Sequence, residues 1–249
     1  MTSSAGLAAA APADPPKNSL FHLVWFYMRT GPQVERTTKY LNGVFLPAAR
    51  RAGLGPIGFF SPVIGEHSPY VLSLVTYPSF ASMETAHAHF AEDQEFAKGW
   101  DAYNDIADPP YVRMESTLLR AFDGMPALAV PATDAQHASH IFEMRVYESV
   151  NEKASRRKMK MFEDGEIGIF RRLGMTPVFF SQTIVGRNLP SIAYMLAFDD
   201  LAARDRLWRN FGADPEWQKL RVQPGLSDAE IVSNITNTIL RPLAFSQIR

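Results

Sequence analysis

The 249-residue chain is an internal duplication. When residues 20–121 are set on residues 141–242 with a constant shift of 121 and no gap, glycine, proline, aromatic and helix-capping positions coincide. These residue types determine backbone path and core contacts, so the two halves are expected to share a fold unit. The identical pairs include Phe21/Phe142, Arg51/Arg172, Gly53/Gly174, Pro56/Pro177, Phe59/Phe180, Gly65/Gly186, Pro69/Pro190, Phe90/Phe211, Asp93/Asp214, Glu95/Glu216, Leu119/Leu240 and Arg120/Arg241.

Each half has the pattern of a β-α-β-β-α-β unit. Alternating or β-branched segments predict strands, helical composition predicts helices, and Gly174 stands where a helix would end. This order of elements is that of the ferredoxin-like unit. In the second half the expected strands cover 142–147, 176–185, 192–198 and 231–240, and the expected helices cover 152–173 and 201–221.

Two such units in one chain predict a barrel. A single ferredoxin-like unit has helices on only one face of its antiparallel sheet, so the other face needs a cover. We therefore expect an α+β fold in which two tandem βαββαβ units pack sheet to sheet as a pseudo-dimeric α/β barrel. The expected divisions are a disordered leader over 1–19, a first unit over 20–122, a linker over 123–140 and a second unit over 141–249.

Charge and composition exclude several classes of protein. The 25 basic and 26 acidic side chains leave a net charge of -1, so no nucleic-acid partner is expected. Because the chain has no cysteine, disulfides, thiolate nucleophiles and zinc-thiolate sites are excluded. No apolar run approaches the length of a membrane span.

The N-terminal leader affects the cellular compartment that we expect for the protein. Residues 1–16 are small and carry a single charge, Asp14, and Ala11-Pro-Ala13 has the form of a signal-peptidase site without the basic region expected before it. As written, the chain is expected in the cytoplasm. A twin-arginine segment upstream of the recorded start would instead direct it to the periplasm.

Polar residues alternate along the first and fourth strands expected in the second unit. Glu143, Arg145 and Tyr147 share one face of the first strand, and Asn234 and Thr236 share one face of the fourth, which pairs with it in this topology. We expect these residues to form the polar end of one pocket, with Arg145 and Tyr147 as candidate catalytic groups. Glu143, Asn234 and Thr236 are candidate ligand-binding residues.

The first unit offers a different set. His22 lies on a strand expected to run beside Arg113 and Glu115, so His22 is a candidate general base, and the other two are candidate ligand-binding residues. A satisfied, partly buried histidine is the alternative. No cofactor and no metal are expected: His87 and His89, two residues apart on a helix, point to different sides.

The second half resembles a known family. The segment Phe-Glu-Met-Arg-Val-Tyr-Glu over 142–148, IFRRLGMTPVFFSQTIVG over 169–186 and the closing IVSNITNTILRPL resemble a NIPSNAP domain, and the likeness is weaker over 20–121. The resemblance implies the dimeric α/β-barrel superfamily, which also holds small monooxygenases, haem-degrading enzymes and lactone isomerases. It implies no agreed reaction.

Three functions follow as hypotheses. The first is a NIPSNAP-type protein that binds a small, largely apolar ligand between its two sheets. The second is a cofactor-free or haem-linked monooxygenase or isomerase. The third is a non-catalytic interaction protein whose helices form a homo-oligomer.

Overall fold

The computed structural model describes residues 18–105, 107–133 and 139–249, and these form a closed, eight-stranded antiparallel barrel. The strand order around the barrel is β1-β3-β2-β8-β5-β7-β6-β4, so each half contributes four adjacent strands. The predicted pair of βαββαβ units is confirmed. The strands are β1 (Leu20–Tyr27), β2 (Gly58–Ile64), β3 (Tyr70–Tyr77), β4 (Arg113–Ala121), β5 (Ile141–Glu148), β6 (Thr176–Val185), β7 (Ser191–Phe198) and β8 (Asn234–Pro242).

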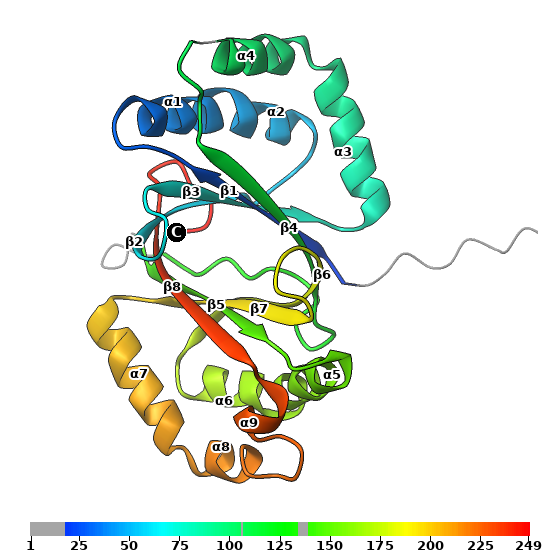
Figure 1. Cartoon of the computed structure of the whole chain (residues 1–249), viewed down its shortest axis with the longest axis vertical. Coiled ribbons are helices and arrows are strands. Elements are labelled where there is room, and N and C mark those ends of the chain that lie inside the picture. The colour runs from blue at the N-terminus through cyan, green and yellow to red at the C-terminus, as the bar shows by residue number, and fades with distance from the viewer. Residues whose placement is uncertain (1–17, 106, 134–138) are drawn as a thin grey trace, which may run out of the picture.

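Helices cover the outer face of each half, as Figure 1 shows with one helical layer above the barrel and one below it. The helix predicted over 152–173 is one run of α-, π- and α-helical turns. The π-helical turns η1 and η2 occupy equivalent positions, 121 residues apart. The helical elements are α1 (Pro32–Tyr40), η1 (Leu41–Phe45), α2 (Leu46–Arg51), α3 (Phe80–Glu92), α4 (Gln94–Asn104), α5 (Glu152–Met161), η2 (Phe162–Glu166), α6 (Ile167–Arg172), α7 (Leu201–Ala213), α8 (Pro215–Leu220) and α9 (Asp228–Ile231).

Equivalent aspartates explain why the second helical segment of each half is broken in two. Asp93 and Asp214 are the N-caps of α4 and α8: Asp93 accepts a hydrogen bond from one backbone N–H group of the following turn and Asp214 from two. Arg51 and Arg172 pair with these carboxylates at 2.6 and 2.9 Å. A cap satisfies amide groups that a helix start leaves unpaired, so these shared residues determine the backbone path.

The two halves join along two seams of the barrel. Strand β2 pairs with β8, and β4 pairs with β6, and each seam contains a register shift. Within each half the first strand lies between the third and the fourth. The sheets therefore cover each other's open faces, which is the solution expected for a duplicated ferredoxin-like unit.

Apolar side chains fill three layers. One cluster lies inside the barrel and includes Phe21, Leu23, Phe142 and Met144, and one further cluster lies between the sheet and the helices of each half. Because side chains alternate along a strand, the odd residues of β1 and the even residues of β5 point into the barrel. Their neighbours point outward to the helices.

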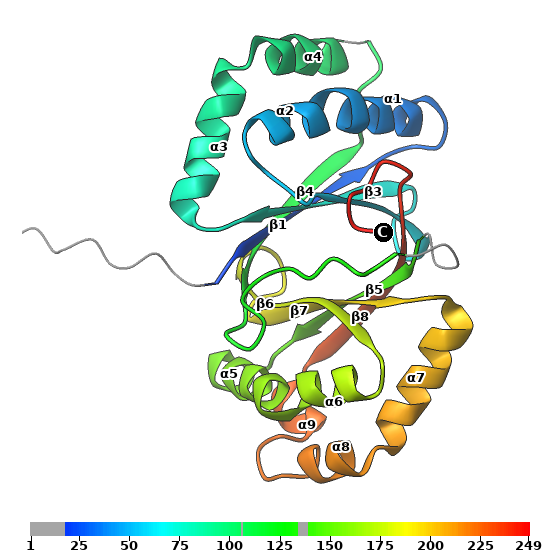
Figure 2. The same cartoon turned by 180° about the vertical axis from the view of Figure 1, so that it is seen from behind.

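One end of the barrel is closed by segments outside the strands. Leu128 of the linker and the fully buried Ile248 near the C-terminus pack against the barrel cluster. The Ala129 N–H donates to the Val178 carbonyl and the Gln247 N–H to the Ile57 carbonyl, which fixes both segments at this end. Figure 2 shows the linker crossing this side of the barrel. Residues 1–17 of the expected leader and 134–138 of the expected linker lie outside the described residues.

Candidate functional site

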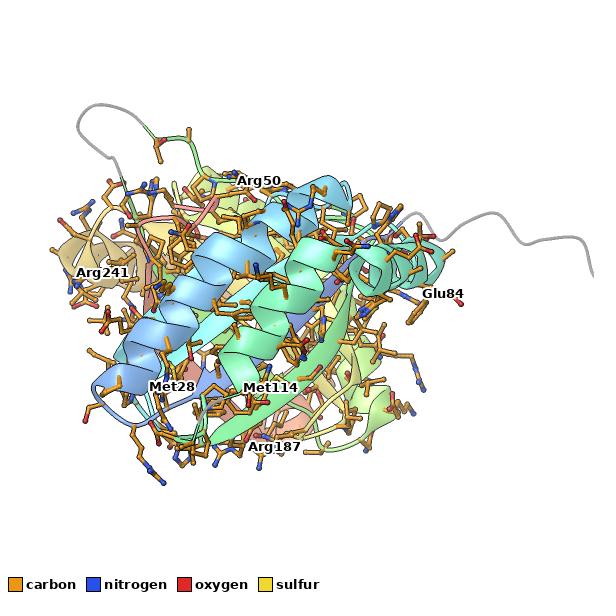
Figure 3. The ribbon with its side chains drawn as sticks, turned by 90° about the horizontal axis from the view of Figure 1, so that it is seen from above. Met28, Arg50, Glu84, Met114, Arg187 and Arg241 are labelled. Atoms are coloured by element: carbon orange, nitrogen blue, oxygen red, sulfur yellow. The ribbon has the colours of Figure 1, made fainter. Side chains whose placement is uncertain are left out.

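A pocket of ≈ 700 Å³ occupies the other, open end of the barrel. Strands β1, β5, β4 and β8 contribute to its walls, as do the β2–β3 and β6–β7 turns at its rim. In Figure 3, Met28, Met114 and Arg187, which lie in or beside elements that reach this end, appear along one side of the molecule, and Arg50 lies on the opposite side. Pockets of this size, part apolar and part polar, are typical of small-molecule sites.

The pocket has two unlike walls. Strands β1 and β5 are four places apart in the eight-stranded order, so they face each other across the barrel, and so do β3 and β7. Trp25 of β1 and Val146 of β5 occupy equivalent positions, as do Leu72 of β3 and Ala193 of β7, and all four line the pocket. The first half thus presents large side chains where the second half presents small ones, and this difference leaves space for a ligand.

The polar part of the lining includes several hydroxyl groups and one indole N–H. Thr117 and Thr236 line the pocket from β4 and β8, and Thr183 accepts a hydrogen bond of 2.8 Å from Ser191. Among the residues that the structure describes, the Trp25 indole N–H and the hydroxyls of Thr117 and Thr236 have no hydrogen-bond partner. These three groups are free to bind a ligand.

Charged residues gather at the rim. The Glu115 carboxylate forms an ion pair with Arg113 at 2.6 Å, and it accepts hydrogen bonds from Arg187 at 2.8 Å and from the Tyr27 hydroxyl at 3.3 Å. The Arg113 guanidinium also lies 4.2 Å from the centre of the Tyr27 ring. Burial and the neighbouring carboxylate raise the pKa of Tyr27, so its hydroxyl keeps its proton at neutral pH.

A second carboxylate, that of Glu148, binds two asparagines of the rim. One oxygen of Glu148 accepts from the side-chain amides of Asn188 at 3.1 Å and Asn234 at 2.8 Å. Asn188 and its equivalent His67 both have a left-handed backbone, with φ of 58° and 57°, at the turns that frame the pocket. Asparagine tolerates this conformation better than most residues.

The structure divides the residues predicted to form one site. Three of them line the pocket: Asn234, Thr236 and Glu115. Arg113 does not line it but forms an ion pair with Glu115 at the rim. Glu143, Arg145 and Tyr147 do not: in the β5–β8 ladder they lie opposite Ile239, Asn237 and Ile235, on the outer face of the sheet. The expectation of a single pocket that joins these three to Asn234 and Thr236 is wrong.

Glu143, Arg145 and Tyr147 instead form a buried network beneath α7. The fully buried Glu143 carboxylate accepts from Arg145 at 2.9 Å, from Arg204 at 2.7 and 3.0 Å, and from the Trp208 indole at 2.7 Å. Burial alone raises the pKa of a carboxyl group, but these bonds and charges outweigh burial and hold the pKa of Glu143 below its ordinary value. Glu143 is therefore ionised and fully paired, which is a structural arrangement.

The network continues through tyrosines. Arg145 donates to the Tyr147 hydroxyl at 3.0 Å, and the Tyr194 hydroxyl donates to the same oxygen at 3.0 Å. The Arg145 guanidinium stacks 4.5 Å from the centre of the Trp208 ring. With its charge paired and its plane covered, Arg145 holds β5 against α7 and is not available to the barrel pocket.

His22 also lies outside the barrel. Its ring contacts the Ser116 hydroxyl at 2.7 Å on the outer face of the β1–β4 pair, whereas Glu115 lies on the inner face. Burial, and to a smaller extent His87, lowers the pKa of His22 to about 4. The alternative of a satisfied, partly buried histidine describes this geometry, and His22 does not meet Arg113 or Glu115.

The pocket residues that sequence reasoning missed include three large aromatic side chains. Trp25, Tyr27 and Tyr70 line it, and their signal was present as the alternation of Leu23, Trp25 and Tyr27 along β1. The expected pairing of β1 with β4 was wrong by one residue. In the structure, odd-numbered residues of β1 share a face with odd-numbered residues of β4, as Trp25 does with Glu115. A one-residue slip moves a whole strand face to the other side of the sheet.

The described ranges contain neither a candidate metal site nor a candidate membrane-spanning helix. No group of three or more histidine or carboxylate side chains is placed to hold a metal ion within residues 18–105, 107–133 and 139–249. Over the same part of the chain, no helix has both the length and the apolar character that crossing a membrane requires.

Comparisons with known proteins agree with this architecture. The NIPSNAP family model matches residues 18–124 and 142–247. No curated protein matches the sequence. An uncharacterized NIPSNAP-like domain protein from Burkholderia xenovorans is 26% identical, with 45% of this chain and 90% of that chain covered and a TM-score of 0.39.

Longer structural matches span both halves. A monooxygenase-like protein from Lactobacillus acidophilus covers 90% of this chain and 94% of its own, with a TM-score of 0.61 and 8% identity. A second monooxygenase-like protein, from Fusobacterium nucleatum, covers 91% and 93%, with a TM-score of 0.57 and 10% identity. At such identities the likeness is one of fold.

Proposed function

The chain belongs to the NIPSNAP family, with one NIPSNAP domain in each half, and from this premise we propose that it is a single-chain binding protein for a small, uncharged, largely apolar molecule. The ligand enters the open end of the barrel. The ≈ 700 Å³ pocket between the two sheets carries the proposal. An apolar cavity of this kind excludes water from a ligand's apolar surface, which is the main driving force for binding such molecules.

The position of the pocket supports binding more than it supports assembly. The pocket lies within the barrel, between strands of both halves, and the linker and the C-terminal segment close the barrel's other end. Charged side chains stay at the rim, where Glu115 and Glu148 already have partners. A ligand that enters therefore loses water from its apolar surface without having to desolvate an unpaired protein charge.

Fluorescence of an uncharged probe tests this function. N-phenyl-1-naphthylamine, which brightens in apolar surroundings, should bind the full chain, and Val146→Trp should abolish binding because the indole fills the pocket. The substitution introduces the residue found at the equivalent position, Trp25, so the fold should tolerate it.

The matched control is Val24→Leu, on the outer face of β1, which should bind the probe as the unchanged protein does. Circular dichroism verifies that both variants are folded. If the folded Val146→Trp variant bound the probe with unchanged affinity, the barrel pocket would not be the site.

The enzyme hypothesis loses its candidate base. His22 cannot reach a ligand in the pocket because it lies on the outer face of β1. A monooxygenase or isomerase reaction therefore stays an alternative that rests on likeness of fold. The homo-oligomer stays a prediction as well, and light scattering of the purified chain would distinguish a monomer from a dimer.

A further inference from the structure

We infer that the molecule taken up by the barrel is a flat, uncharged ring compound that carries a carbonyl or a similar hydrogen-bond acceptor. This inference names the ligand class and rests on the proposed function. It comes from the difference between the two walls, from the unpaired polar groups in the lining, and from the absence of charge below the rim in the described residues.

The wall from the first half carries three aromatic side chains, Trp25, Tyr27 and Tyr70. Trp25 and Tyr27 point to the same side of β1, and Tyr70 lies directly opposite Tyr27 on β3. The Tyr27 and Tyr70 rings meet edge to face, with centroids 5.4 Å apart. Aromatic side chains gain more from a second ring than from an equal area of saturated carbon, because ring faces and edges carry opposite partial charges.

The wall from the second half leaves a slot in front of this surface. Its residues at the positions of Trp25, Tyr70 and Leu72 are Val146, Ser191 and Ala193, all of them smaller. Large residues facing small ones across a barrel leave a space beside the aromatic wall rather than at the barrel centre. A flat molecule fills such a space with its ring face against the large residues.

The free polar groups select the ligand's substituent. The Trp25 indole N–H is only a donor, so its partner must be an acceptor. Thr117 and Thr236 offer hydroxyls that can donate or accept, and within the described chain all three groups lack protein partners. A carbonyl oxygen on the ring system satisfies the indole, and the threonines accommodate further oxygens.

The charges select an uncharged ligand. Tyrosines apart, the charged or titratable side chains that line the pocket belong to the turns or to the end of β4 at the rim; they are Glu66, His67, Glu115 and Arg187. Asn237 apart, the deeper lining is formed by aliphatic, aromatic and hydroxyl-bearing residues. An ionised group on the ligand would lose its water there without gaining a counter-charge, which is unfavourable.

Three probes of one carbon skeleton test the ligand class. 9-Fluorenone is flat and has a carbonyl, fluorene is flat and has none, and perhydrofluorene is neither flat nor polar. Each is titrated into the full chain against bound N-phenyl-1-naphthylamine. We expect fluorenone to bind about tenfold more tightly than fluorene, and fluorene to bind about fivefold more tightly than perhydrofluorene.

Trp25→Phe separates the two contributions. This variant keeps the aromatic wall and removes the indole N–H, so fluorenone should weaken to the affinity of fluorene while fluorene itself stays unchanged. Equal affinities for all three compounds would overturn the ligand class and leave the proposed function standing, as would probe binding that none of them displaces. If N-phenyl-1-naphthylamine itself does not bind, the proposed function fails and the ligand class fails with it.

Discussion

The Lys158 ammonium lies 2.7 Å from the Glu166 carboxylate, and both side chains are almost completely buried between α5, η2 and the sheet of the second half. The equivalent positions in the first half hold Thr37 and Phe45. The same fold unit is thus built in one chain with and without this ion pair. The pair is a property of the second half and is not required for the fold.

Removing one partner of this pair should destabilise the protein strongly. Lys158→Met leaves the buried Glu166 carboxyl without its ion-pair partner, and we expect a loss of about 3–5 kcal/mol in the free energy of unfolding at neutral pH. The double variant Lys158→Met/Glu166→Leu should recover most of that loss, because apolar groups of similar size can replace a buried pair. Urea denaturation of the single and double variants measures both effects.

The single variant should also respond to pH. Burial raises the pKa of Glu166 even though Lys158 opposes it, and without Lys158 only the smaller effect of the Arg145 charge still opposes burial. A raised folded-state pKa means that protonation favours the folded state, so the loss caused by Lys158→Met should shrink as pH falls from 7 to 5. A loss that stays constant over this range would contradict the assignment.

Arg145→Leu should act on stability and leave probe binding unchanged. The change removes the hydrogen bonds to Glu143 and Tyr147 and uncovers a carboxylate that Arg204 and Trp208 still hold. We expect a loss of about 2–3 kcal/mol, against less than about 1.5 kcal/mol for Val24→Leu at the equivalent position. Loss of probe binding with unchanged stability would instead place Arg145 at the ligand.

His22 should make the folded state sensitive to acid. Its pKa is lowered to about 4, mainly by burial, whereas an unfolded histidine titrates near 6.5. The folded state therefore binds fewer protons between these values, and its stability falls as pH is lowered from about 6.5 to 4. Relative to His22→Gln, the unchanged protein should lose about 2 kcal/mol over this range, since solvent screens the partly exposed ring. Parallel denaturation curves for the two proteins would rule this out.

The C-terminal closure of the barrel should contribute measurably to folding. Ile248 is fully buried in the barrel cluster, so Ile248→Ala should cost about 2–4 kcal/mol through lost burial and the cavity left behind. Val150→Ala, at a half-exposed position, is the control and should change stability by less than about 0.5 kcal/mol. Thermal denaturation of both variants provides the comparison.

The duplication made the architecture predictable. Shared glycines, prolines and caps, such as Asp93 and Asp214, report backbone path directly, and a ferredoxin-like sheet can bury its open face in few ways. The closed end of the barrel could not be predicted from the sequence. Leu128 and Ile248 lie in segments without periodicity, and the packing of these segments depends on strands that are distant in the sequence.

The site was predicted only in part because its assembly depends on register. Asn234, Thr236 and Glu115 were identified from their strands, and they do line the pocket. Alternation reveals which residues share a face but does not reveal which face turns inward when both are apolar, as on β1. Glu143 and Arg145 illustrate the consequence: charged residues on a core strand were interpreted as a ligand site, and their partners, Arg204 and Trp208, lie some 60 residues further along the chain.

The unequal walls of the pocket have a consequence for how a ligand can be oriented. Two identical subunits would line such a barrel with matching halves, and an unsymmetrical molecule could then bind equally well in two poses related by a half-turn. In this chain Trp25 faces Val146, so a half-turn would bring the ligand's ring face against a small aliphatic residue and its oxygen away from the indole. Fusing the two domains into one polypeptide lets the halves diverge, which would remove this degeneracy and select a single pose for the proposed ligand.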